Sequence, residues 1–143
     1  MFQYNEPGNV TLIYRFGGHQ IEKCLSPLIE AVQQAGKVVL WICGPMHGNN
    51  QKTLNSIKTR NFNHILSELE QAFKIHQLAG SYLGGVHFEL TCDNVTECVG
   101  GARSMSEADL TRAYKTLCDP RLNYEQSLEM VIFIAKHMVG MDG

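Results

Sequence analysis

The sequence has little of what marks several classes of protein. Charged residues make up only 18% of its 143 residues and the net charge is −2, so no basic surface for nucleic acid is indicated. No apolar run approaches the roughly 20 residues that cross a bilayer, and no signal-peptide pattern opens the chain. The five cysteines are odd in number and lack C-x-x-C spacing, which argues against a disulfide scaffold or zinc finger. We expect a cytoplasmic protein with reduced thiols and no nucleic acid or membrane partner.

What the sequence does have is enough apolar residues, 44% of the chain, to form a core. We therefore expect residues 1–143 to form a single domain. Mostly apolar runs predict strands over 10–16, 38–43 and 86–90. Helical patterns separate these runs, and such alternation is typical of an α/β fold with parallel strands.

Local signals predict where the first two helices begin and end. Ser26 is a plausible N-cap, Pro27 fits the first helical position and Gly36 fits the C-terminal stop. Apolar residues recur at helical spacing over 62–73, and Gly80 closes that segment.

The C-terminal part of the sequence predicts a long loop over 91–104, a short helix over 106–114 and a last helix. The last helix is expected to begin after Asn123, with Gln126 in a capping-box arrangement. Its expected core face consists of Leu128, Val131, Ile132 and Ala135. Three parallel strands leave both edges of the sheet unpaired, so the pattern is typical of part of a larger barrel or sheet.

Cationic side chains stand near expected strand and helix ends. Arg15 ends the first strand beside Gly17 and can bind a phosphate with two hydrogen bonds, or can simply be solvated. Lys58 and Arg60 precede the second predicted helix, whose start favours anions; two solvated charges are the alternative.

Three further residues are candidate metal ligands. His47 lies in a Pro/Gly/Asn-rich turn and is either a metal ligand or acid/base group, or an exposed loop histidine. Glu89, two residues after His87 in an apolar strand, needs a metal or an arginine to compensate its charge. Asp119 is either a hard oxygen ligand or an Asp-Pro turn residue. We predict that His47, Glu89 and Asp119 bind one divalent metal, and we assign Glu97 to a solvated loop.

Six segments in order and at similar spacing give the chain a close resemblance to the class II 3-deoxy-D-arabino-heptulosonate 7-phosphate (DAHP) synthases. They are LIYRFG (12–17), CGPMHGN (43–49), KTR (58–60), GGVHFE (84–89), NVTECVGG (94–101) and CDPRLN (118–123). The resemblance implies a partial (β/α)8 TIM barrel of about three βα units, the C-terminal portion of a fold that needs ~250 residues. It departs from the family pattern at Gly44, where the family usually carries aspartate.

The resemblance also implies a function in the shikimate pathway of aromatic amino acid biosynthesis. It implies a transferase that condenses phosphoenolpyruvate with erythrose 4-phosphate and uses a divalent metal, manganese or cobalt, to polarise the sugar aldehyde. By position, His47, Glu89 and Asp119 match metal ligands, Arg15 matches a phosphoenolpyruvate-binding arginine, and Lys58 matches a lysine of the substrate pocket. We assign Arg60 to substrate binding as well. We assign catalytic roles to Lys58 and His47.

The alternative is a non-catalytic DAHP-synthase-like protein that binds a metal or phosphate ligand. Because the resemblance leaves the first part of the barrel uncovered, we expect a homo-oligomer or assembly with an N-terminal partner chain.

Overall fold

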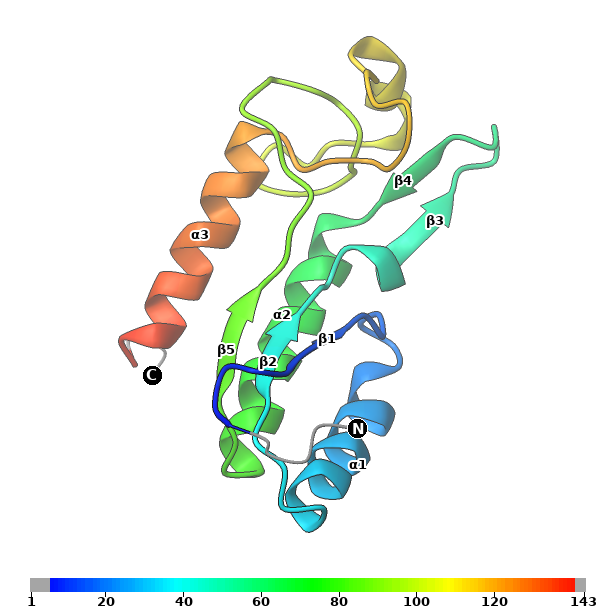
Figure 1. Cartoon of the computed structure of the whole chain (residues 1–143). Coiled ribbons are helices and arrows are strands. Elements are labelled where there is room, and N and C mark those ends of the chain that lie inside the picture. Colours follow the sequence, from blue (N-terminus) through cyan, green and yellow to red (C-terminus); the bar gives the residue numbers. More distant parts are fainter. Residues whose placement is uncertain (1–5, 141–143) are drawn as a thin grey trace. The chain divides into compact units, whose positions relative to one another are not determined.

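The computed structural model describes residues 6–140, which divide into two compact units (Figure 1). Of the described residues, the first unit comprises 6–48 with 67–88, and the second comprises 49–66 with 89–140. The elements, in chain order, are β1 (Thr11–Tyr14), α1 (Ile21–Gln34), β2 (Leu40–Cys43), the 3-10 turn η1 (His47–Asn49), β3 (Asn50–Lys52), β4 (Lys58–Arg60), α2 (Phe62–Leu78), β5 (Leu83–Val86), the 3-10 helix η2 (Glu107–Arg112) and α3 (Tyr124–Met138).

The first unit contains a three-stranded parallel sheet with strand order β1–β2–β5 (Figure 1). Thr11 pairs with Leu40, and the register continues to Tyr14 opposite Cys43. On the other side of β2, Trp41 pairs with Leu83. The predicted α/β fold with parallel strands is therefore confirmed, although β1 and β2 are shorter than their apolar runs.

Aromatic and imidazole rings form the centre of this unit. His76, on α2, is only 2% exposed, and its ring centroid lies 5.9 Å from that of Tyr14 and 5.6 Å from that of Trp41. Its ring nitrogens lie 3.3 Å from the Tyr14 hydroxyl and 2.6 Å from Ser81 Oγ. The buried imidazole therefore has polar partners on both sides, as a buried polar group requires.

The second unit contains an antiparallel hairpin of β3 and β4 that the sequence analysis did not predict. Asn50 pairs with Arg60, and Lys52 pairs with Lys58. The connecting turn is closed because the Ile57 N–H donates to Thr53 Oγ1. Its strands consist of polar and charged residues, so they lack the apolar alternation by which strands are predicted.

Helix α3 begins as predicted. The Gln126 N–H donates to the Asn123 side chain and the Gln126 side chain accepts from the Asn123 N–H, which completes the capping box. The short helix predicted over 106–114 is η2, with Ser106 as its N-cap. Helix α2 ends two residues before Gly80, which adopts a φ of 63° as a helix stop.

Other predicted boundaries are wrong. Helix α1 begins at Ile21, not after Ser26, and Pro27 lies inside it. The reason is that Ile21 and Leu25 are both fully buried, and burial of these two side chains contributes more than Pro27 costs the helix.

The predicted third strand is also displaced. β5 ends at Val86, so His87 and Glu89 lie beyond it, and the prediction that both belong to a strand is wrong. Within the predicted strand 86–90, Leu90 forms an isolated parallel bridge with Leu122.

The predicted core face of α3 is wrong as well. Leu128, Val131 and Ile132 are 58%, 55% and 48% exposed, and Ala135 is exposed too. The helix buries Gln126 and Met130 instead. Within residues 6–140, no helix combines the length and apolar character that crossing a membrane requires.

The buried imidazole predicts a pH-dependent stability of the fold. Burial lowers the pKa of His76 from 6.5 to about 4, so between these values the unfolded chain binds the proton and the folded chain does not. The free energy of unfolding should therefore fall with acidification, by about 3 kcal/mol between pH 7 and pH 4 from this group alone. We expect His76→Gln to lose this contribution, measured as a smaller change in urea-unfolding free energy between these two pH values. His19→Gln, at an exposed histidine, should keep the dependence of the unmodified chain; equal behaviour of the two variants would contradict the assignment.

Candidate functional site

The centre of the candidate site in the second unit is the guanidinium of Arg60, which is fully buried. Its Nε donates to Asn50 Oδ1 over 2.8 Å, and its Nη1 donates to the carbonyl of Pro120 over 2.6 Å. Nη1 also donates to Glu89 Oε2, and Nη2 lies 3.6 Å from Asp119 Oδ2. Two carboxylates from distant parts of the sequence thus meet on one arginine.

The second cation of this site is Lys58, which stands two residues before Arg60 on β4. Its ammonium group pairs with Asp119 Oδ1. The Lys58 side chain is 39% exposed, whereas those of Asp119 and Glu89 are 20% and 24% exposed. The two cations balance the two carboxylates, and the partial exposure of Lys58 leaves its donors open to an anion from solvent.

Backbone hydrogen bonds hold the two acidic residues in place. The Leu122 N–H donates to the carbonyl of Glu89 over 3.0 Å, and the Thr91 N–H donates to the carbonyl of Leu122. The Thr116 hydroxyl donates to the carbonyl of Asp119 over 2.8 Å. Both acidic residues therefore lie on segments with a defined backbone, and the Asp-Pro sequence is part of an ordered loop.

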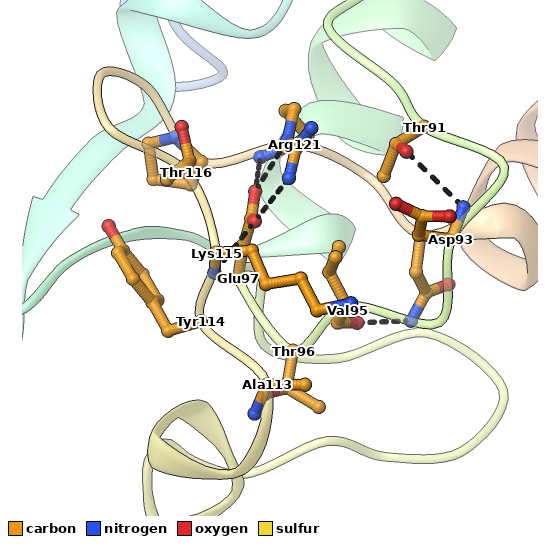
Figure 2. A network of polar contacts seen from close by, with 12 residues as sticks. Thr91, Asp93, Val95, Thr96, Glu97, Ala113, Tyr114, Lys115, Thr116 and Arg121 are labelled. Atoms are coloured by element: carbon orange, nitrogen blue, oxygen red, sulfur yellow. Dashed lines mark hydrogen bonds and ion pairs between the residues drawn. The ribbon is translucent and has the colours of Figure 1, made fainter.

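Glu97 is the site residue that sequence reasoning missed: it is fully buried, so the assignment to a solvated loop is wrong. Figure 2 shows its carboxylate facing Arg121, whose N–H, Nε and Nη2 donate to it over 2.8, 3.0 and 2.7 Å. The Lys115 N–H donates over 3.2 Å. Burial by itself would raise the pKa of Glu97, but the hydrogen bonds from Arg121 and Lys115 outweigh it and lower the pKa. The sequence signal for the burial of Glu97 is its apolar neighbours Cys98 and Val99. Both of these neighbours are buried in the structure.

Two other predicted site residues belong to the first unit. Arg15 directly follows β1 and is exposed, and an ideal Cβ built on Gly44 would lie 3.1 Å from its Cγ. His47 begins the η1 turn that follows β2. The backbones of Gly17 and Gly48 touch so closely that a Cβ on either would overlap the other, so the turn after β1 and the turn after β2 are packed together.

The structure therefore brings four predicted residues together in one unit: Lys58, Arg60, Glu89 and Asp119. It also supplies Glu89 with the arginine partner that the sequence analysis named as the alternative to a metal. His87 is exposed in the first unit.

The parallel sheet, with Arg15 directly after β1, defines an α/β protein. Proteins of this class keep their functional sites at the carboxyl ends of strands. The model of the class-II DAHP synthetase family matches residues 3–135. The chain belongs to this family, and the resemblance seen in its sequence segments is confirmed.

Two relatives show the extent of the match. The phospho-2-dehydro-3-deoxyheptonate aldolase AroG of Mycolicibacterium smegmatis is 46% identical over 132 residues. The phospho-2-dehydro-3-deoxyheptonate aldolase of Neurospora crassa is 48% identical over 134 residues. Each alignment covers 92% of this chain and 28% of the relative. The chain therefore spans little more than a quarter of the length of these relatives.

The close packing of the two turns in the first unit leads to a prediction. Gly48→Ala should destabilise the fold by about 2 kcal/mol or more, because the new Cβ meets backbone atoms of Gly17 that cannot move aside. Gly44→Ala is the matched control, since its Cβ meets the flexible Arg15 side chain and should cost less than about 1 kcal/mol. Urea unfolding of both variants tests this, and equal stabilities would contradict it.

Proposed function

We propose that this chain provides part of the active site of a DAHP synthase, the transferase that condenses phosphoenolpyruvate with erythrose 4-phosphate and releases phosphate. The observation that carries the proposal is the cluster of Lys58, Arg60, Glu89 and Asp119 in a chain of the class-II DAHP synthetase family. The cluster combines oxygen ligands for a metal with cations for a phosphate, which is what a metal-dependent reaction between two phosphorylated substrates needs. In this role the protein acts in the cytoplasm, in the shikimate pathway that leads to aromatic amino acids.

Glu89 and Asp119 are the proposed oxygen ligands of one divalent cation, with His47 as the third ligand. The three offer one imidazole nitrogen and two carboxylate oxygens, a set that suits manganese or cobalt. The two carboxylates already converge on the single guanidinium of Arg60, so their spacing fits a shared cation. When bound, the metal would polarise the aldehyde of the sugar phosphate.

The cationic side chains have separate proposed roles. Lys58 is the residue that can turn from Asp119 to a substrate phosphate, because its side chain is partly exposed. Arg60 is fully buried and stays with the carboxylates, where it keeps their orientation. Arg15, exposed after β1, binds the phosphate of phosphoenolpyruvate. Gly44 leaves the space beside Arg15 without the carboxylate that the family usually carries there.

The proposed architecture is a (β/α)8 barrel to which this chain contributes about three βα units, with residues 1–143 as one domain. Support comes from the parallel order β1–β2–β5, in which β1 and β5 are both edge strands. An edge strand exposes a row of unpaired backbone groups, and a neighbouring strand of a barrel would pair with them.

Metal binding can be tested directly. In calorimetry with Mn²⁺, Asp119→Asn should bind at least about tenfold more weakly than the unmodified chain, because a charged oxygen ligand is lost. Release of phosphate from the two substrates should fall with it.

Glu125→Gln is the matched control. This variant also removes one carboxylate from the second unit, but that carboxylate belongs to the ion pair of Glu125 with Arg103. It should bind Mn²⁺ as the unmodified chain does. Equal Mn²⁺ affinities for Asp119→Asn and the control would overturn the ligand assignment.

A second candidate function is a non-catalytic protein that binds a metal or phosphate ligand, or assembles with another chain. It is favoured by the pairing of Glu89 and Asp119 with Arg60 and Lys58, because these cations compensate both carboxylates without a metal. Mn²⁺ binding without phosphate release, both alone and with an N-terminal partner chain present, would select this candidate.

The proposed assembly leads to a prediction about the oligomeric state. Several apolar side chains on or directly after α3 are exposed, namely Leu128, Val131, Ile132, Met138 and Val139. Because such a surface favours association, light scattering at micromolar concentration should show a homo-oligomer, or a complex when an N-terminal partner chain is supplied. Leu128→Lys should lower the observed mass, whereas Lys136→Gln, an exposed change on the same helix, should not. A stable folded monomer of the unmodified chain would contradict the prediction.

A further inference from the structure

The buried carboxylate of Glu97 binds a loop at both of its ends. One end is Arg121, which donates through its N–H, its Nε and its Nη2. The other end is Lys115, which donates through its N–H over 3.2 Å. The five residues between these anchors include Asp119. The carboxylate of Glu97 therefore fixes both ends of the loop that carries Asp119, and Figure 2 shows Glu97 with Lys115 and Arg121.

The loop is also closed internally. The Thr116 hydroxyl donates to the carbonyl of Asp119 over 2.8 Å, and the Cys118 N–H donates to the same hydroxyl oxygen over 3.2 Å. With both ends fixed and its middle bridged, the loop has little freedom to move Asp119 without breaking the bonds to Glu97.

On its other side, the segment of Glu97 is bound to β4. The carbonyl of Glu97 accepts from the buried Thr59 hydroxyl over 2.8 Å. The Val99 N–H donates to the carbonyl of Arg60 over 2.9 Å. The residue before Lys115 is also bound to β4, because the Tyr114 hydroxyl donates to the carbonyl of Lys58 over 2.6 Å. Glu97 thus stands between the strand that carries the two cations and the loop that carries Asp119.

We propose that Glu97, through Arg121, is a positioning residue that sets the place of the Asp119 carboxylate relative to Lys58 and Arg60. The effect that we expect on metal binding rests on the proposed function. Glu97 itself is fully enclosed and its oxygens are occupied by Arg121 and Lys115, so it acts through the loop and not as a ligand. A charge-assisted, two-pronged contact of this kind restricts geometry more than a neutral hydrogen bond does.

The test compares Glu97→Gln with Glu125→Gln in the full chain. The two variants make the same change, but Glu125 pairs with Arg103 and not with a residue of the loop. At a temperature where both variants are folded by circular dichroism, Glu97→Gln should bind Mn²⁺ about tenfold more weakly, and Glu125→Gln should match the unmodified chain. Glu97→Asp, which keeps the charge with a shorter side chain, should recover part of the loss. A role in stability alone would lower the melting temperature of Glu97→Gln and leave its Mn²⁺ affinity within about twofold, which would overturn the proposal.

A second measurement does not depend on metal. A double-mutant cycle with Lys58→Met and Asp119→Asn gives the coupling between these residues in urea unfolding. The coupling constant should fall several-fold when the cycle is repeated in the Glu97→Gln background, and in the Glu97→Asp background if the first variant does not fold. An unchanged coupling would overturn the proposal. If the unmodified chain binds no Mn²⁺ while the coupling still falls, the proposed function fails and the positioning role of Glu97 stands.

Discussion

The second unit depends on one constraint, which is the complete burial of a guanidinium. A buried charge costs several kcal/mol unless partners compensate it, and Arg60 carries five N–H donors in a fixed plane. The chain meets this demand with an amide on β3, a carboxylate after β5 and a carbonyl next to Asp119. Because the plane is rigid, the positions of Glu89 and Asp119 follow from it. The arginine therefore organises the acidic residues as well as neutralising them.

The pairing of Glu89 and Asp119 with Arg60 and Lys58 determines the net charge of the proposed site. Two carboxylates beside two cations form a neutral cluster, so a divalent metal at Glu89 and Asp119 adds charge unless a cation withdraws or an anion arrives. Lys58 is the exposed partner and can withdraw, whereas Arg60 is enclosed. A phosphorylated substrate would bring the compensating negative charge. If the chain binds metal and phosphate as proposed, the two would support each other through Lys58, because each compensates the charge that the other brings.

The features that sequence analysis predicted correctly have short-range causes. The capping box of Asn123 and Gln126 needs only three residues of separation, and the parallel strands follow from apolar runs that alternate with helical periodicity. The failures have long-range causes. Glu97 looked solvated because its partner Arg121 is 24 residues away. The hairpin that carries Lys58 and Arg60 has polar strands, and the Val99 N–H, 39 residues after Arg60, donates to the carbonyl of Arg60. The outward-facing apolar residues of α3 were assigned to a core by periodicity, which does not tell which apolar stripe is covered.

By itself, the sequence determined the family, the α/β class and the residue types at the site, because these depend on ordered motifs and on local periodicity. It left open whether Glu89 is compensated by a metal or by an arginine. Only the tertiary structure decided that Arg60 pairs with Glu89 and that Lys58 pairs with Asp119, across separations of 29 and 61 residues. The physical reason is that an ion pair depends on the distance between charges in space. That distance is fixed by how the hairpin, the segment of Glu89 and the Asp119 loop pack within the second unit, and not by their spacing along the chain.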